Sequence, residues 1–524
     1  MPNFIPYNPN QDAFIAINFL DQLQQGTFEH AIHYLVEHKL DLSVFYSAYN
    51  NDKVGRRAYD PAILLKIILF AYSKGITSSR EIQWCCEKNV IFKALSCDKV
   101  PHFTTIADFV SSQPEAIEQL FEQIVLICYQ QGLIGNELFA IDGCKMPSNA
   151  AKEWSGTHQE LERKRDKIKR QISHLMNKHE QTDWLQKDKS ALLQQQQRAE
   201  QTIETLNNSF NKIDEFLKIS SPRIGNGKQK KEVKSNITDN ESAKMTTSKG
   251  TIQGYNGLAA VDKKHQIVID AQAFGEGQEH HSLQPVLESI KSRFKNVGIS
   301  DDIYQQGAIV TADTGFANEA NMKYLHDNNI DGYIPDNQFR SRDPKFQDQK
   351  ENHKKPKRPK QKKETKIPSS EFTFDPVKLT CHCPAGESLS FKVQKKDNQG
   401  NEKVFFRGRA TQCRSCHLKK SCMENPSAAN DSKHGGGRQV SFILAKRRTP
   451  NYTDWMKHRI DSEKGKTIYS HRMSVVEPVF GNIGTNKGLI RFSLRGKKKV
   501  QGQWQLFCMV HNIEKLNNYG EMAA

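Results

Sequence analysis

The sequence has no long apolar run and no leader-like start. The sequence of 524 residues contains no uninterrupted apolar stretch of about 18 residues, which is the length that indicates a membrane-spanning helix. The first residues, MPNFIPYNPNQD, lack the basic-then-apolar order of a secretory signal peptide. We therefore predict a cytoplasmic protein without a membrane partner.

Acidic residues are scarce relative to basic ones. The chain has 59 Asp and Glu against 76 Lys and Arg, which gives a formal net charge of +17 and a pI near 9.2. Such an excess favours a polyanionic partner, because basic side chains neutralise phosphates and release counterions. Nucleic acid is the first candidate, and ribosomal or membrane-surface binding would explain the charge as well.

Disulfides are rare in a reducing compartment, so the cysteines need another interpretation. Five of the eleven cysteines cluster between residues 381 and 422, which favours a metal site. The pair in Cys413-Arg-Ser-Cys416 has the spacing of zinc ligands, and further thiols complete a tetrahedral set. The predicted zinc ligands are Cys383, Cys413, Cys416 and Cys422, with Cys381 as an alternative to Cys383.

A chain of this length is too long for one hydrophobic core, and about three to four folding units are expected. Residues 1–135 are predicted to form an all-α domain. Asp60, followed by proline, marks the start of one helix and Gly75 its end. Ser78 with Glu81 three residues later predicts a capping box for the next helix.

The same region contains a short helix predicted over residues 106–111. Short helices joined by tight turns allow a helix-turn-helix, with Thr104 and Thr105 near the start of the reading helix. A plain helical bundle is the alternative, because no basic stripe marks that helix.

Residues 136–337 contain the signals of a mixed sheet. Asp142 ends the apolar run in LFAIDG and Asp313 ends the run in AIVTADTGF, so each acid stands at the end of a predicted strand. The order strand, hairpin, helix, strand, with these acids, is that of an RNase H-like core. A turn former before glycine is the alternative interpretation of Asp142. The predicted elements are strands 137–143, 254–261, 266–273, 308–312 and 331–335 and a helix over 281–294.

Two insertions interrupt the predicted core. Residues 155–220 are rich in Gln, Lys and Glu, with apolar residues at alternating threes and fours, which predicts a coiled coil folded as an antiparallel hairpin. Its expected role is that of a structural or dimerising arm. Residues 338–450 combine the cysteine cluster with a basic run over 354–363 that is able to lie along a phosphate backbone. The polar and basic stretch 220–245 is interpreted as a loop or a partly disordered crossing.

Residues 451–524 are predicted to add helices to the core. One of them, over residues 469–487, has apolar residues at helical spacing that leave Tyr469, Arg472 and Glu477 near a second face. A carboxylate flanked by cations suits a metal site beside a phosphate, and a surface helix with incidental charges is the alternative. Together with the aspartates at the two predicted strand ends, Glu477 would complete the set of three carboxylates that a two-metal nuclease needs.

Longer motifs carry a resemblance to a known family. They are YDPAILLKIILFAYSKG, IDGCKMPSNAAKEWSG, GYNGLAAVD, ADTGFANEANMKYL, CPAG with CRSCHLKKSC, and SVVEPVFGNI with WQLFCMVHNIEKL. Over nearly its whole length the chain resembles the DDE transposases of bacterial insertion sequences, in the cysteine-bearing branch of the superfamily with a Tyr-Arg-Glu-Lys signature. The expected fold is α/β and multidomain: an RNase H-like catalytic core, an N-terminal all-α DNA-binding domain, a coiled-coil insertion and a zinc-binding cysteine insertion.

The resemblance also implies roles for individual residues. The family's catalytic acids, which hold magnesium, fall on Asp142, Asp313 and Glu477. The signature tyrosine and arginine fall on Tyr469 and Arg472, which would bind DNA phosphates, and Lys487 is the candidate for the signature lysine. Four residues separate Arg472 from Glu477 and nine separate Glu477 from Lys487, and both spacings are longer than in the superfamily signature.

The activity implied by the resemblance is DNA transposition. Two Mg²⁺ ions per active site would support cleavage and strand transfer at terminal inverted repeats. Double-stranded DNA, at the element ends and at the target, would be the partner of a homodimer that is associated with the bacterial nucleoid when bound. A catalytically inactive nucleic-acid-binding protein and an RNase H-fold nuclease without strand transfer are the two alternatives.

Overall fold

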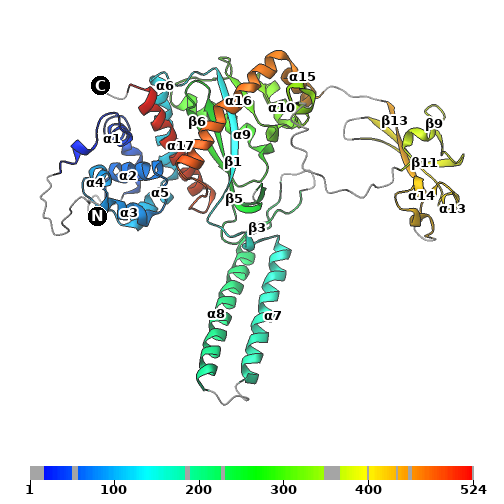
Figure 1. The fold of residues 1–524 in the computed structure, drawn as a ribbon, viewed down its shortest axis with the longest axis horizontal. Helices are drawn as coiled ribbons and strands as arrows, with labels where there is room; N and C mark the ends of the chain where they lie inside the picture. Colours follow the sequence, from blue (N-terminus) through cyan, green and yellow to red (C-terminus); the bar gives the residue numbers. More distant parts are fainter. Residues whose placement is uncertain are drawn as a thin grey trace, which may run out of the picture. The chain divides into compact units, whose positions relative to one another are not determined.

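The computed structural model describes residues 17–49, 57–182, 189–225, 230–248, 250–346, 366–397, 401–431, 435–445 and 451–521. The chain forms two compact units (Figure 1). The first comprises Met1–Asn337 and Met456–Ala524, and the second comprises Gln338–Trp455. The N-terminal helices therefore belong to the same unit as the central sheet. The predicted basic run over 354–363 lies outside the described residues.

A six-stranded mixed sheet forms the centre of the first unit, with the strand order β4-β5-β1-β7-β8 and with β6 paired to β5. β1, β7 and β8 are parallel, whereas β5 is antiparallel to β1 and to β6. The first four residues of β1 are apolar and buried, as expected for a strand covered on both faces. Each strand predicted in this part is present. The strands are β1 (Leu138–Pro147), β4 (Ala243–Thr247), β5 (Gly250–Asp262), β6 (Val268–Phe274), β7 (Ile309–Ala312) and β8 (Asp331–Tyr333).

Helices from distant parts of the chain pack on this sheet. α9 packs on β6, α16 crosses β1, β5, β7 and β8, and α17 lies along β6. Residues 502–513 of α17 are all buried, so this helix is covered on every side. α17 therefore occupies the centre of the unit, between the sheet and the N-terminal helices (Figure 1). The helices are α9 (Leu283–Asn296), α10 (Glu319–Asp327), α15 (Tyr452–Asp461), α16 (Glu463–Gly481) and α17 (Lys497–Tyr519).

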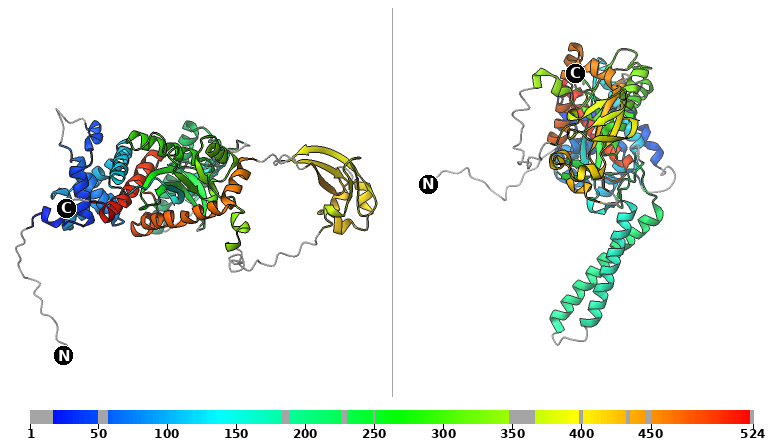
Figure 2. Two further views of the ribbon diagram at one scale, coloured as in Figure 1. Left: turned by 90° about the horizontal axis from the view of Figure 1, so that it is seen from above. Right: turned by 90° about the vertical axis from the view of Figure 1, so that its right-hand side faces the viewer.

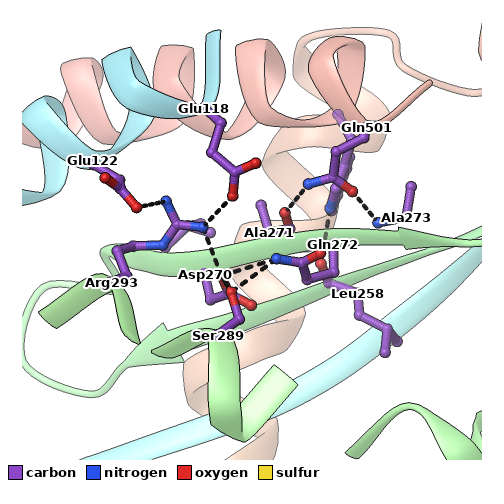
Figure 3. Close-up of polar contacts among 12 residues, drawn as sticks. Glu118, Glu122, Leu258, Asp270, Ala271, Gln272, Ala273, Ser289, Arg293 and Gln501 are labelled. Carbon is purple, nitrogen blue, oxygen red and sulfur yellow. Dashed lines mark hydrogen bonds and ion pairs between the residues drawn. The ribbon is translucent and has the colours of Figure 1, made fainter. Parts of the chain in front are cut away.

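Two amide side chains of α17 bind the backbone of β6 directly. Gln501 bonds to the carbonyl of Ala271 and to the N–H of Ala273, each at 2.6 Å (Figure 3). Asn512 bonds in the same way to both backbone groups of Val268 at 2.8 Å. These groups lie on the side of β6 that β5 does not use, so the amides cover what would otherwise be an open strand edge.

The N-terminal helices form as the sequence predicts, with one exception in their caps. Asp60 accepts a hydrogen bond from the Ala62 N–H at 2.8 Å and caps α2, and Gly75 has a φ of +76° after its end. Ser78 makes no side-chain cap to α3, so the predicted capping box is wrong. The helices are α1 (Phe28–His38), α2 (Pro61–Ser73), α3 (Ser79–Lys88), α4 (Val90–Ser96), α5 (Phe103–Ser112) and α6 (Pro114–Gln130).

A buried ion cluster joins α6 to the sheet (Figure 3). The Arg293 side chain of α9 is 1% exposed and donates to Asp270 Oδ1 of β6 at 2.9 Å. It also pairs with Glu118 at 3.3 Å and with Glu122 at 3.5 Å, both from α6. Ser289 donates a further hydrogen bond to Asp270 at 2.8 Å. The charge of one arginine is thus shared among three acids from two parts of the unit.

The insertion between β1 and β4 is a pair of antiparallel helices that lie side by side (Figures 1 and 2). α7 spans His158–Thr182 and α8 spans Lys189–Ile219. Leu161, Ile168 and Ile213 are buried between them near the base of the hairpin. The His158 backbone N–H donates a hydrogen bond to Glu232 Oε1 at 2.6 Å, which ties this base to the following segment.

The segment after α8 is more ordered than the predicted loop. It contains β3 (Ser235–Asn236), which pairs with β2 (Ser155–Gly156), and then β4. Asp239 is buried and accepts a hydrogen bond from the Tyr255 hydroxyl at 2.8 Å. Most of the described segment forms neither helix nor strand, as the loop interpretation predicts, and buried polar pairs, which have no hydrophobic periodicity, hold it in place.

The second unit is a five-stranded antiparallel sheet in the order β13-β12-β11-β10-β9. Its small core contains Phe372, Val404 and Phe406. Three short helices belong to the same unit: α11 (Phe339–Arg342), α13 (Ala410–Arg414) and α14 (Lys419–Cys422). The strands are β9 (Thr373–Asp375), β10 (Thr380–His382), β11 (Ser388–Lys396), β12 (Glu402–Arg407) and β13 (Gln439–Ala445).

Candidate active site

Two aspartates meet beside neighbouring parallel strands. Ile141 of β1 is in register with Ala312 of β7, so the next residues along the chain, Asp142 and Asp313, lie side by side. Asp313 directly follows β7 as predicted, but the prediction that Asp142 ends its strand is wrong, because pairing with β5 continues β1 to Pro147. Gly143 follows Asp142, and a Cβ at that position would lie 2.2 Å from Leu258 Cδ2. Glycine at position 143 therefore leaves room for the Leu258 side chain of β5 beside the first aspartate.

Arg472 of α16 supplies the positive charge beside these aspartates. Its Nη2 lies 3.0 Å from Asp142 Oδ2 and 3.7 Å from Asp313 Oδ1. The arginine side chain is 7% exposed, against 44% for Asp313. Burial raises the pKa of Asp142 to about 6, with smaller contributions in the same direction from Asp313 and Glu279, while Arg472 and the Gly143 N–H oppose the rise.

Glu477 is exposed and lies on another side of α16. Five positions along a helix correspond to about 140° around its axis relative to Arg472. The next residue, Pro478, has no N–H, so the Ser474 carbonyl is free to accept a hydrogen bond from Gln266 at 3.0 Å. Within the described residues no hydrogen bond or ion pair joins Glu477 to either aspartate of the site.

The remaining signature residues differ in exposure. Tyr469 is half-buried and precedes Arg472 by three residues, which places it on the same side of the helix. The Lys487 side chain is 1% exposed, and its ammonium group pairs with Glu514 of α17. A phosphate would contact Lys487 only if that ion pair opened.

One carboxylate at the site was missed by the sequence analysis. Glu279 lies in the short 3-10 helix Glu279–His281, which follows β6. Its Oε1 accepts a hydrogen bond from Asn256 Nδ2 at 3.0 Å. The only signal in the sequence was the acidic and histidine-containing loop EGQEHH, which has no characteristic spacing.

The donors at this site have the chemistry that a hard divalent cation prefers. Asp142 of β1 and Asp313, which follows β7, offer carboxylate oxygens side by side, and the Arg472 guanidinium lies against both. A cation would compete with the guanidinium for the same oxygens. In the described part of the chain, no group of three or more His, Cys, Asp and Glu side chains is arranged to hold a metal ion.

The four thiols predicted to bind zinc line one small cavity of the second unit. Its volume is about 30 Å³, which is room for one small ion or water. The Cys383 carbonyl accepts a hydrogen bond from the Gly386 N–H at 2.8 Å, which closes a tight turn at the cavity. Cys381 is instead buried in the hydrophobic core, on β10 between β9 and β11. The cavity is lined by Cys383, Cys413, Cys416 and Cys422.

The short helix that was predicted as a reading helix is α5. It packs against α2, α3 and α17. Thr104 is exposed near its first turn and Thr105 is half-buried.

The described residues contain no helix both long and apolar enough to cross a membrane.

Two protein families match the chain. A Transposase DDE domain matches residues 382–517, which include Tyr469, Arg472 and Glu477. A Transposase domain (DUF772) matches residues 17–112, within the N-terminal helices. No curated protein matches the sequence significantly.

The two matches define an enzyme class that cleaves nucleic acid. More particularly, they identify the chain as a DDE-type transposase of insertion sequences, and this family implies binding to DNA. Neither match distinguishes the cysteine-bearing branch.

Proposed function

We propose that this transposase catalyses metal-dependent cleavage and strand transfer at the terminal inverted repeats of its element. The observation that carries the proposal is the meeting of Asp142 and Asp313, 171 residues apart in the chain, beside Arg472. The strand order, with two parallel strands after an antiparallel meander, supports an RNase H-like core.

Asp142 and Asp313 would hold Mg²⁺, with Glu477 as the third acid that the family resemblance assigns. When bound, two such ions supply a metal-bound nucleophile and stabilise the charge on the leaving oxygen. Glu477 is exposed on α16, five residues after Arg472, and its part in the metal site rests on the family resemblance.

Arg472 and Tyr469 would hold the DNA strand beside the cut. The guanidinium group has the planar geometry that binds two phosphate oxygens, and it is already at the aspartates. With cations on the carboxylates, Arg472 would be available to bind a DNA phosphate. The half-buried Tyr469 would contact the same strand from the preceding turn of the helix.

The other parts would supply recognition and assembly. The N-terminal helices would read the inverted repeats, with exposed Thr104 in the reading helix. The four cysteines of the second unit would bind one structural Zn²⁺, supported by their shared cavity. Two copies of the chain would hold two element ends together, and the α7–α8 hairpin is the candidate arm.

Neutralising the proposed acids tests the function. Asp142→Asn, Asp313→Asn and Glu477→Gln remove a ligand charge with little change of shape, so cleavage and strand transfer of end-bearing DNA in Mg²⁺ should fall by orders of magnitude. DNA binding should persist. Glu463→Gln on the same helix, where the side chain is 94% exposed, is the matched control and should retain activity.

The outcomes separate the competing functions. Cleavage without joining of the two ends would indicate a nuclease. DNA binding with no cleavage by the unmodified protein would indicate an inactive nucleic-acid-binding protein. Near-normal cutting by the Asp142→Asn protein would overturn the proposed site.

A further inference from the structure

Glu279 stands closer to the aspartates than its place in the sequence suggests. A Cβ at Gly315, two residues after Asp313, would lie 2.4 Å from Glu279 Oε2. The Glu279 carboxylate therefore rests against the backbone that follows the second aspartate. Glycine at position 315 is what leaves room for it.

The carboxylate is also linked to the first aspartate's strand. Asn256 is fully buried and donates to Glu279 Oε1 at 3.0 Å. A Cβ at Gly143, next to Asp142, would lie 2.9 Å from Asn256 Oδ1. One carboxamide thus bridges the backbone beside Asp142 and the carboxylate of Glu279.

The helical turn that carries Glu279 is fixed in place. The His280 carbonyl accepts hydrogen bonds from Asn318 at 2.8 Å and from Asn321 at 3.0 Å. Both asparagines belong to the segment that follows Asp313, since Asn318 caps α10. The turn that carries Glu279 is therefore hydrogen-bonded to the segment that follows Asp313.

Two features of this group favour the binding of a cation. Asn256 Oδ1 is buried without a hydrogen-bond partner, which is costly unless something else occupies it. Among the described residues no Lys or Arg forms an ion pair with Glu279, and Arg472 is the cation paired with Asp142 and Asp313. Three carboxylates next to one guanidinium leave an excess of negative charge, which a cation would neutralise.

We propose that Glu279 is a further metal-binding carboxylate, which acts with Asp142 and Asp313, and that Asn256 is the positioning residue that holds it there. This inference rests on the proposed function of the same site. It adds a ligand from the connection between β6 and α9, whereas the family signature supplies its glutamate from α16. The excess of carboxylate oxygens suits a site for small, hard divalent cations.

Binding of Mn²⁺ to the full-length protein, measured by electron paramagnetic resonance without DNA, tests the inference independently of activity. Glu279→Gln should weaken Mn²⁺ binding about tenfold or more, as losses of metal-site groups do. Glu276→Gln removes the same charge from an exposed position of the same loop and should leave the affinity within about twofold. Equal affinity of the Glu279→Gln and unmodified proteins would overturn the inference.

A second variant displaces the carboxylate without removing its charge. Gly315→Ala places a methyl group 2.4 Å from Glu279 Oε2, too close for the carboxylate to stay, so it should also weaken Mn²⁺ binding. In a Glu279→Ala background the same change has nothing to displace and should add little, which a double-mutant cycle measures. Equal losses in both backgrounds would show that Gly315→Ala acts on the backbone alone and would overturn the assigned contact.

The aspartate variants separate this inference from the proposed function. If Asp142→Asn and Asp313→Asn weaken Mn²⁺ binding but Glu279→Gln does not, only the role of Glu279 fails. If none of the three changes the affinity, the proposed metal site itself fails.

Discussion

Side chains at the site are positioned by two glycines without a Cβ atom and by a proline without an N–H group. Gly143 and Gly315 have no Cβ, and each therefore leaves room for a side chain from another element. Pro478 has no N–H, which frees the Ser474 carbonyl to bind Gln266 at the β5–β6 turn. In each case a missing atom at one residue determines a contact between elements far apart in the chain.

His511 of α17 is a buried histidine that folding keeps neutral. Its Nε2 bonds to the Gln266 carbonyl at 2.9 Å and its Nδ1 accepts from Asn482 at 3.0 Å. Burial lowers the pKa of His511 to about 4. Both ring nitrogens are used by the neutral imidazole, and a second proton would displace the Asn482 donor.

This histidine should make the protein less stable in mild acid. Below the ordinary histidine pKa of about 6.5, the His511 imidazole binds a proton in the unfolded chain but stays neutral in the folded chain. The free energy of unfolding should therefore fall as the pH decreases from 6.5 to 4. The loss should reach about 3 kcal/mol. Urea unfolding at pH 7.5 and pH 5 measures it. His511→Gln should remove this part of the pH dependence, whereas His326→Gln, half-exposed on α10, should retain it.

At the scale of elements, α17 is shared by parts that the sequence separates. Its buried amides cover the edge of β6, while its other sides pack against α1, α2, α5 and α6. Deleting residues 1–135 would expose apolar surface of α17 to water. The N-terminal helices are therefore required for the stability of the sheet as well as for any role in DNA recognition.

The ion cluster between α6, α9 and β6 should contribute strongly to stability. Arg293→Met leaves Asp270 buried without a cation, and breaking a buried pair in this way costs about 3–5 kcal/mol. Lys291→Met on the same helix removes a pair in which the lysine is 49% exposed, which should cost about 0–1 kcal/mol. Chemical denaturation of the two variants compares them, and similar losses would show that the cluster adds no more than a surface pair.

At the scale of the whole molecule, the two units differ in how they are stabilised. The first has an extensive apolar core around a mixed sheet, whereas the second has a small core beside the cavity lined by thiols. A metal bound to those thiols would supply much of the folding free energy of the second unit, as in other small metal-binding folds.

Zinc removal should therefore affect one unit only. The purified protein should contain about one zinc per chain, and a chelator should increase hydrogen exchange in residues 366–445 while the sheet of the first unit stays protected. Cys416→Ser should lose the metal. Cys381→Ala, in the hydrophobic core, should retain it but lower the melting temperature. A metal content of zero after gentle purification contradicts the proposed zinc site.

The sequence by itself determined the elements that depend on local signals. Apolar runs ending at Asp142 and Asp313 predicted β1 and β7, and the cap at Asp60 predicted α2. These signals are sufficient because a strand or helix requires only a short periodic pattern and a suitable end. The segment 220–245 carried no such pattern, and its buried polar pairs could not be predicted.

Only the tertiary structure decided which side chains meet. Arg472 and Glu477 were expected together near one face of their helix, yet α16 crosses the sheet so that Arg472 is buried against both aspartates while Glu477 is exposed. Glu279 comes from a connection with no motif, and it reaches the site because two distant glycines leave space. Contacts between side chains from distant parts of the chain depend on strand register and on the angle at which helices cross the sheet. Both are set by packing over the whole chain.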